Sequence, residues 1–237
     1  MRPIGFSTGA VAKADFRCAL ARLRIHGITV VELSALRLDE LAPLVQALDS
    51  LDLEGFEFVS FHAPSRFSPD DEAYVVDRLQ SVLEREIPVV VHPDVIFRPA
   101  LWDDMGPGLL IENMDKRKAV GRTAEALRSL FDCFPKARFC FDLGHARQVD
   151  PTMMEARLIL ENLGERLAEV HISEVNTSSR HDPLSAWAIS AFRSVASLVP
   201  DNIPIVLESL IDQGQSDVLT EVDRARRALD QTMCAIG

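Results

Sequence analysis

Short apolar runs recur along the whole chain, and most of them are rich in Val, Ile and Phe. Their apolar character is nearly continuous, which is typical of strands buried on both faces of a parallel sheet. This pattern predicts eight strands: Pro3–Phe6, Thr29–Leu33, Phe56–Phe61, Pro88–His92, Leu109–Glu112, Arg138–Asp142, Ala168–Ile172 and Pro204–Glu208.

Apolar residues at helical spacing, such as Val75, Leu79 and Val82, lie between most of these runs. Most predicted strands end about thirty residues apart, and a strand–helix unit of that length, repeated eight times, is typical of a (β/α)8 barrel. One interval is only about 20 residues, so we expect the fourth helix, around Pro99–Asp104, to be abbreviated. An open doubly wound sheet is the alternative, but no glycine-rich phosphate loop follows the first strand. We therefore predict an α/β protein with a single TIM-barrel domain over residues 1–237.

Composition is that of an ordinary globular protein, with 47% hydrophobic and 26% charged residues. No apolar run approaches the ~20 residues that a membrane span needs. No charged-then-apolar leader precedes Ile4, so we also expect no signal peptide. The four cysteines have no paired spacing, and we expect them to be small buried residues in a reducing compartment. These features predict a cytoplasmic protein.

The net charge of −11 makes nucleic acid an unlikely partner, because proteins that grip duplexes usually present a basic face. Charge alone does not exclude it, since bound metal ions add local positive charge. The densest basic groups, Lys116–Lys118 and Arg224–Arg227, resemble solvated helix surface. With no basic cluster at a strand end, we expect an unphosphorylated small molecule as the partner. The oligomeric state stays open, a homo-oligomer included.

Ionisable residues end the apolar runs at corresponding positions: Glu112, Asp142, His171 and Glu208. In a barrel the carboxyl ends of all strands surround one cavity, so these side chains would meet there. Three converging carboxylates repel one another and are costly to bury, and a divalent cation removes that penalty. Any one of them could equally be a strand-end charge paired with an arginine. Four together favour a metal site of histidine and carboxylate ligands.

Four further histidines end or follow predicted strands. His62 and His92 would either complete a second metal site with Glu112 or bind substrate oxygens. His145 follows the sixth strand and His181 lies in the loop after the seventh, and these two would form a third site or hold the substrate. The alternative for each is a hydrogen-bonded residue at the barrel rim.

Several segments, in this order, resemble the xylose-isomerase-like TIM-barrel superfamily, which includes sugar isomerases and epimerases and enzymes of the endonuclease IV type (AP endonuclease family 2). Each segment is weakly specific alone, but together they span nearly the whole chain and are strongly specific for the fold and the metal site. They are Ser60-Phe61-His62-Ala63-Pro64, Val90-Val91-His92-Pro93, Ile111-Glu112-Asn113, Phe141-Asp142-Leu143-Gly144-His145-Ala146, Val170-His171-Ile172 and Val206-Leu207-Glu208.

The resemblance implies roles for these residues. In the sugar epimerases of this superfamily a Glu, Asp, His, Glu quartet binds one divalent metal, often Mn²⁺, and the two glutamates exchange the substrate proton. The corresponding metal ligands here are Glu112, Asp142, His171 and Glu208. Glu112 and Glu208 would be catalytic, with Mn²⁺ as the expected ion and Zn²⁺, Co²⁺ or Mg²⁺ as alternatives.

The DNA-repair branch holds three zinc ions with nine ligands. Eight of them have counterparts here, namely the quartet together with His62, His92, His145 and His181. The ninth, an aspartate in that branch, is replaced by Ser179, with Asp182 as a nearby substitute. The usual glycine-rich stretch of the superfamily is replaced by residues 183–187. The serine argues against a complete trinuclear site, and the missing glycine-rich stretch leaves the substrate contacts of that loop unpredicted.

Three functions follow, of which we rank first a metal-dependent isomerase or epimerase acting on a small sugar, polyol or keto acid. The metal would polarise a carbonyl and stabilise an enediolate while a glutamate moves the proton. His62, His92, His145, Arg180 and His181 would bind substrate, and Trp102 or Trp187 would cover a sugar face or simply pack. The alternatives are an endonuclease IV-like zinc phosphodiesterase acting on abasic DNA and a barrel that binds metal or ligand without turnover.

Overall fold

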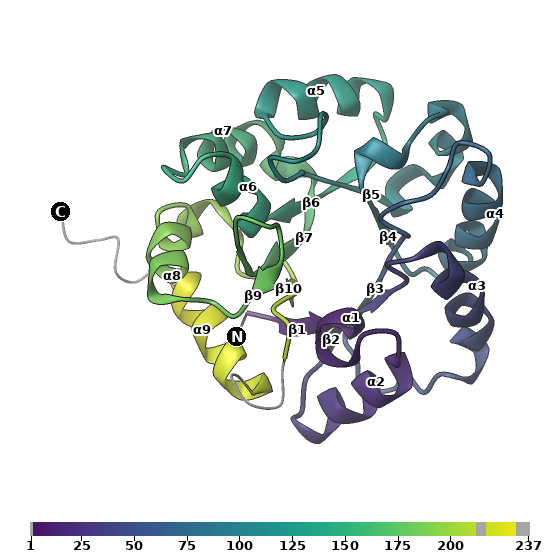
Figure 1. The fold of residues 1–237 in the computed structure, drawn as a ribbon, viewed down its shortest axis with the longest axis horizontal. Helices are drawn as coiled ribbons and strands as arrows, with labels where there is room; N and C mark the ends of the chain where they lie inside the picture. The colour runs from purple at the N-terminus through teal and green to yellow at the C-terminus, as the bar shows by residue number, and fades with distance from the viewer. Residues whose placement is uncertain (1, 212–216, 231–237) are drawn as a thin grey trace.

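The computed structural model describes residues 2–211 and 217–230. Eight parallel strands of this part close into a barrel, in which the last strand returns to pair with the first (Figure 1). The predicted (β/α)8 barrel is confirmed, and each predicted strand is found with limits that differ by no more than one or two residues. The strands are β1 (Ile4–Ser7), β2 (Val30–Ser34), β3 (Phe58–His62), β4 (Val89–Val91), β5 (Leu109–Glu112), β6 (Arg138–Asp142), β7 (Leu167–Ile172) and β10 (Ile205–Leu207).

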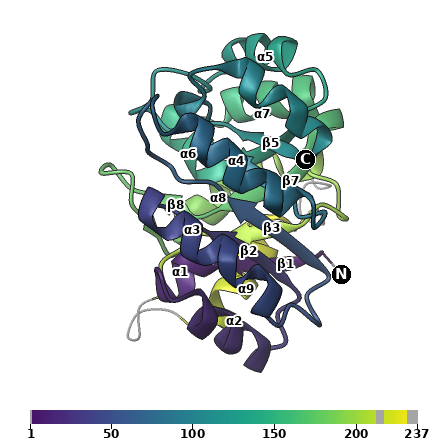
Figure 2. The ribbon, with the colours of Figure 1, turned by 90° about the vertical axis from the view of Figure 1, so that its right-hand side faces the viewer.

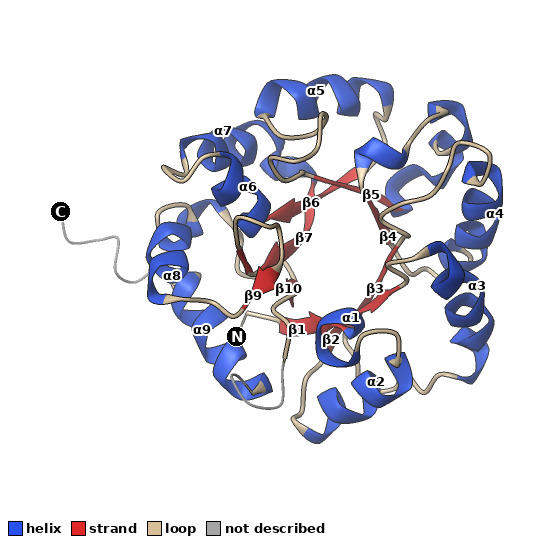
Figure 3. Cartoon of the chain, viewed as in Figure 1, coloured by secondary structure: helices blue, strands red, loops and turns tan. Residues whose placement is uncertain are grey.

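Helices form an outer ring around the strands, as Figure 3 shows. The longer helices bury an apolar face against the barrel; α4, for example, buries Val75, Leu79 and Val82. Within residues 2–211 and 217–230, no helix combines the length and the apolarity needed to cross a membrane. The helices are α1 (Thr8–Ala12), α2 (Phe16–Ile25), α3 (Leu38–Ala47), α4 (Glu72–Leu83), α5 (Ala124–Cys133), α6 (Leu143–Val149), α7 (Met154–Leu163), α8 (Ala186–Arg193) and α9 (Val218–Ala228).

The connection from β4 to β5 confirms the predicted abbreviated fourth helix. It contains the 3-10 turns η2 (Pro93–Val95), η3 (Pro99–Leu101) and η4 (Asp103–Gly108). Prolines start the first two turns, and Gly106, with a φ of 54°, interrupts the third. Trp102 fills the space beneath, fully buried, with its Nε1 donating to Glu72 Oε1 at 2.9 Å.

Alternate strand residues face either the helices or the barrel interior. Outward residues such as Phe61, Val91 and Ile111 join the main core between strands and helices. The inward residues Val90, Leu110, Cys140 and Ala168 form a separate apolar cluster inside the barrel. Two residues further along β4, β5 and β6 the inward positions are His92, Glu112 and Asp142. The candidate site therefore lies on top of a small apolar plug.

The first two strands approach each other closely at Gly5. A Cβ atom at this position would lie 1.8 Å from the carbonyl oxygen of Val30. That distance is far below van der Waals contact, and the obstructing atom belongs to the backbone. The barrel therefore requires glycine at this inward position.

An antiparallel hairpin of β8 (Glu174–Val175) and β9 (His181–Asp182) follows β7. Figure 2 shows β8 at the same end of the barrel as α1, which directly follows β1. The hairpin therefore lies at the carboxyl end of the strands, where it presents Arg180 and His181.

The cysteines differ from the prediction. Cys140 is buried inside the barrel as expected, but Cys18 and Cys133 are exposed. Both lie on the outer helices α2 and α5, where they face solvent rather than the barrel. The prediction is therefore wrong for these two, and Cys234 lies outside the described residues.

Candidate metal centre and substrate cavity

The four predicted metal ligands converge at the carboxyl end of the barrel. Glu112 and Asp142 end neighbouring strands, His171 lies in β7, and Glu208 directly follows β10. One ligand atom from each residue lies within 4.8 Å of those of the other three. His171 Nδ1 is 3.6 Å from Glu112 Oε1 and 3.6 Å from Glu208 Oε1. Barrel closure thus brings together residues that are far apart in sequence.

The chemistry of this group fits a divalent cation. Four buried polar atoms of this group have no hydrogen-bond partner: Glu112 Oε1, Asp142 Oδ2, His171 Nδ1 and Glu208 Oε2. His171 Nε2, which faces Glu32, has none either. Buried polar atoms without partners are costly and uncommon in folded proteins. Three carboxylates and one imidazole are a donor set for Mn²⁺, Mg²⁺, Co²⁺ or Zn²⁺. An ion here would satisfy all four atoms at once.

The carboxyl groups have unequal electrostatic surroundings. Burial raises the pKa of Asp142 to about 7, assisted by the charge of Glu208 and opposed by His145. Burial would also raise the pKa of Glu112, but the charge of His92 and hydrogen bonds from other histidines hold it well below its usual value. The pKa of Glu208 is likewise lowered, because nearby histidines outweigh its burial. Both glutamates are therefore ionised at neutral pH.

Local hydrogen bonds position Asp142. Asn113 joins the ends of β5 and β6, since its Nδ2 donates to Asp142 O at 2.9 Å and its Oδ1 accepts from Asp142 N at 2.7 Å. Asp142 Oδ1 accepts from His145 N at 2.6 Å and so caps α6. The segment Asp-Leu-Gly-His therefore places both the aspartate and the histidine three residues later.

His62 and His92 form a second potential metal group with Glu112, which is one of the two alternatives that the sequence left open for them. His62 Nδ1 donates to the carbonyl of Ala63 at 2.7 Å, which leaves Nε2 3.4 Å from Glu112 Oε2. His92 Nε2 lies 3.1 Å from the same oxygen. Burial would lower the pKa of His62, but the charges of Glu32 and Glu112 raise it to about 9.

His145 and His181 lie on the opposite side of the quartet. His145 Nδ1 is 3.2 Å from Glu112 Oε1, and His181 Nδ1 is 3.2 Å from Glu208 Oε2 and 2.8 Å from Ser173 Oγ. Within the described part of the chain, no potential metal group contains either histidine. Of the two predicted alternatives, a third metal site and substrate contact, the geometry favours substrate contact.

The ninth ligand position of the DNA-repair branch holds no metal-binding side chain here. Ser179 faces the cavity with a φ of 53°, and its Oγ is hydrogen-bonded to Gln148. Asp182 accepts from Asn176 Nδ2 at 2.8 Å and belongs to none of the potential metal groups among the described residues. Asp182 therefore does not replace the missing ligand.

A buried layer beneath the quartet was missed from the sequence. His171 Nε2 lies 3.1 Å from Glu32 Oε2 and 3.4 Å from Glu169 Oε1, and Ser60 Oγ donates to Glu169 Oε1 at 2.8 Å. All four residues are fully buried. Two features of the sequence could have indicated this layer. Glu32 is a carboxylate in the middle of the apolar run of β2, and Glu169 lies two residues before His171, on the same face of its strand. A carboxylate on the far nitrogen orients a metal-binding imidazole.

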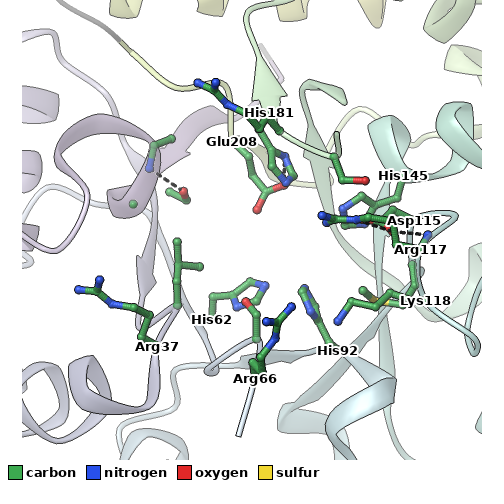
Figure 4. A pocket seen from close by; sticks show the side chains of 18 of the residues that line it. Arg37, His62, Arg66, His92, Asp115, Arg117, Lys118, His145, His181 and Glu208 are labelled. Carbon is green, nitrogen blue, oxygen red and sulfur yellow. Dashed lines mark hydrogen bonds and ion pairs between the residues drawn. The ribbon is translucent and has the colours of Figure 1, made fainter. Parts of the chain in front are cut away.

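A cavity of about 680 Å³ lies above the quartet. Its walls include all five residues predicted to bind substrate, His62, His92, His145, Arg180 and His181, together with Glu208 (Figure 4). Neither tryptophan takes part. Trp102 is packed in the core, as one of the two predicted alternatives had it. Trp187 on α8 is 80% exposed and does not line the cavity, so it neither packs in the core nor covers a substrate face.

Basic side chains also gather around this cavity, although the sequence shows no basic cluster at any one strand end. They come from four loops, which barrel closure brings to one rim. Four of the five are labelled in Figure 4. The five are Arg37, Arg66, Arg117, Lys118 and Arg180. Arg117 and Lys118 line the cavity and belong to the group Lys116–Lys118, which lies in the loop after β5, so the interpretation of this group as solvated helix surface is wrong.

No family model and no curated protein sequence matches the chain. Among solved structures, it is similar to a candidate sugar phosphate isomerase/epimerase from Anabaena variabilis, with a TM-score of 0.61 and 15% identity over 97% of this chain and 98% of that one. It is also similar to a xylose isomerase-like TIM barrel protein from Mycobacterium smegmatis in complex with magnesium, with a TM-score of 0.57 and 11% identity over 97% and 98% of the two chains. At such identities the likeness shows the fold alone: the chain has the (β/α)8 TIM-barrel fold of these proteins.

Proposed function

We propose that this protein is a divalent-metal-dependent isomerase or epimerase that acts on a small sugar or a related polyol or keto acid. The observation that carries the proposal is the convergence of Glu112, Asp142, His171 and Glu208, each with an unpartnered buried atom, beneath a cavity of about 680 Å³. The isomerase/epimerase assignment of one structural neighbour and the magnesium bound to the other support it.

A cation held by the quartet would polarise a substrate carbonyl and stabilise the negative charge that develops when the adjacent carbon loses its proton. Glu112 and Glu208 are the residues that would move this proton. Both carboxylates are ionised at neutral pH, so either can accept the proton. In an isomerisation the glutamate that accepted the proton would return it to the neighbouring carbon. In an epimerisation the other glutamate would first take a proton from water and then deliver it to the opposite face of the same carbon. His62, His92, His145, His181 and Arg180 supply hydrogen bonds from the cavity wall to substrate oxygens. We propose Mn²⁺ as the resident ion, with Mg²⁺, Zn²⁺ and Co²⁺ as alternatives.

Elemental analysis of the purified protein, followed by turnover assays on a panel of ketoses, ketose phosphates and keto acids, tests this function. We expect one Mn²⁺ or similar ion for each chain and loss of turnover in Glu208→Gln. The matched control is Glu72→Gln, which removes a buried carboxylate bonded to Trp102 and Arg98, remote from the quartet. Full activity in Glu208→Gln, or protein that binds no metal, would contradict the proposal.

The group of His62, His92 and Glu112 supports a second candidate, a zinc phosphodiesterase resembling endonuclease IV. A second ion there would share Glu112 with the first. It would activate a water molecule for attack on the phosphorus atom of a phosphodiester. The serine at position 179 and the net charge of −11 oppose it. Two or three zinc ions per chain, with nicking of duplex DNA at abasic sites, would establish this candidate instead.

A further inference from the structure

The cavity reverses the charge balance of the chain. Overall, 36 acidic residues outnumber 25 lysines and arginines. Along the cavity wall, five basic side chains outnumber the two acidic ones, Asp115 and Glu208. Glu112 and Asp142 lie beneath, and a divalent cation would offset two of the resulting four carboxylates. A concave site with this excess of positive charge attracts anions and concentrates them.

Three of the five basic residues are already ion-paired with acids of the chain: Arg37 with Glu40 at 2.8 Å, Arg117 with Asp115 at 2.9 Å and Lys118 with Asp94 at 2.5 Å. The other two, Arg66 and Arg180, differ in this respect. Their guanidinium groups make no hydrogen bond or ion pair with any residue in the described ranges 2–211 and 217–230. Both line the cavity, so their donors are free for a ligand.

These two arginines flank the predicted substrate-binding histidines. Arg66 lies four residues beyond the end of β3, at the same edge of the cavity as His62 and His92 (Figure 4). Arg180 directly precedes His181 in the β8–β9 hairpin. The paired N–H donors of an arginine guanidinium group match two oxygens of a phosphate or carboxylate. They bind such an anion more strongly than they bind neutral hydroxyl groups.

We infer that the substrate carries an anionic group, phosphate or carboxylate, that Arg66 and Arg180 receive while its carbonyl end lies over the quartet. This inference rests on the proposed function in one respect, namely that the cavity is the substrate-binding site. The expectation of an unphosphorylated substrate was based on the lack of a basic cluster at any strand end, and it would be overturned only if the anionic group is a phosphate. The basic side chains around the cavity come from four separate loops.

Anion binding to the full-length protein tests the inference without turnover. Thermal unfolding is followed with inorganic phosphate, malonate or sodium chloride at equal ionic strength, with and without EDTA. The proteins are the wild type, Arg66→Gln, Arg180→Gln and the control Arg85→Gln, whose arginine is paired with Asp49 on the surface. We expect phosphate or malonate to stabilise the wild type and Arg85→Gln beyond the chloride effect. Either cavity variant should bind that anion about tenfold more weakly.

Each result has a defined meaning. Stabilisation by phosphate alone identifies a phosphorylated substrate class, and stabilisation by malonate alone identifies a carboxylate. The inference is overturned if neither anion exceeds chloride, or if both arginine variants respond like the wild type. Arginine-dependent binding in the EDTA arm tests the anion site without any metal. If elemental analysis also finds that the purified protein binds no ion, the proposed function is refuted and the anion site stands.

Discussion

Glu32→Gln tests whether the metal centre depends on the buried layer beneath it. Glu32 Oε2 lies 3.1 Å from His171 Nε2, and Glu169 Oε1 lies 3.4 Å from the same nitrogen. A carboxylate that accepts the Nε2 proton leaves Nδ1 unprotonated and facing Glu112 and Glu208, which is the form that a metal ligand requires. Gln has the same shape but no charge, so the substitution weakens this orientation without creating a cavity.

The structure sets the expected size of the effect. At an effective dielectric constant of about 20, two unit charges 3.1 Å apart would interact by about 5 kcal/mol, which is an upper limit because a metal-binding imidazole is neutral. The net effect is smaller because desolvation opposes the interaction and Glu169 remains as an acceptor. Loss of such a supporting carboxylate typically lowers metal affinity about 10–100-fold, or about 1.4–2.7 kcal/mol. We expect about tenfold for Glu32→Gln and about 100-fold when Glu169→Gln is added.

The assay is competition for Mn²⁺ between the protein and a chromophoric chelator, with urea unfolding of the metal-free protein alongside. Glu72→Gln is the control, because Glu72 is also fully buried but accepts hydrogen bonds from Trp102 and Phe97 N instead of a candidate ligand. It should lower the free energy of unfolding and leave metal affinity unchanged. Unchanged affinity in Glu32→Gln would refute the reasoning. So would the loss of one of two bound ions, since Glu32, Glu169 and His171 would then be a metal site themselves.

Three other predictions concern the barrel and its pH response. Gly5→Ala should lower the free energy of unfolding by about 3 kcal/mol or prevent folding, because its Cβ would meet the Val30 carbonyl; near-normal urea unfolding would disprove the close approach. Asn113→Ala should lower the free energy of unfolding by about 2–3 kcal/mol and should also lower metal affinity, because both buried hydrogen bonds to the Asp142 backbone are lost. Chemical denaturation measures the first effect and metal titration the second. The raised pKa of His62, about 9, means that the metal-free native state binds more protons than the unfolded chain between pH 6.5 and 9. Its stability should therefore fall as pH rises through this window, while the stabilisation by added Mn²⁺ should grow; a rise in metal-free stability would contradict the assignment.

The sequence by itself determined the strands, their order and the quartet. Strands buried on both faces must be apolar along their length, so β5 and β6 were predicted with the limits that the structure shows. Glu112 and Asp142 stood out because each ends such a run. The short interval before β5 predicted the abbreviated fourth helix, since about 20 residues cannot hold two strands and a full crossover helix.

Only the tertiary structure decided which other residues support or surround the site. Glu32 and Glu169 lie within strands, where alternation and barrel closure turn them inward against His171. Arg180 was predicted from the sequence as a substrate-binding residue, but Arg66, 114 residues earlier on another loop, was not. The two line one cavity because their strands close a ring. Local patterns report whether a side chain is buried. The partner that a buried charge meets is set by strand register and closure, which act between segments far apart in the chain.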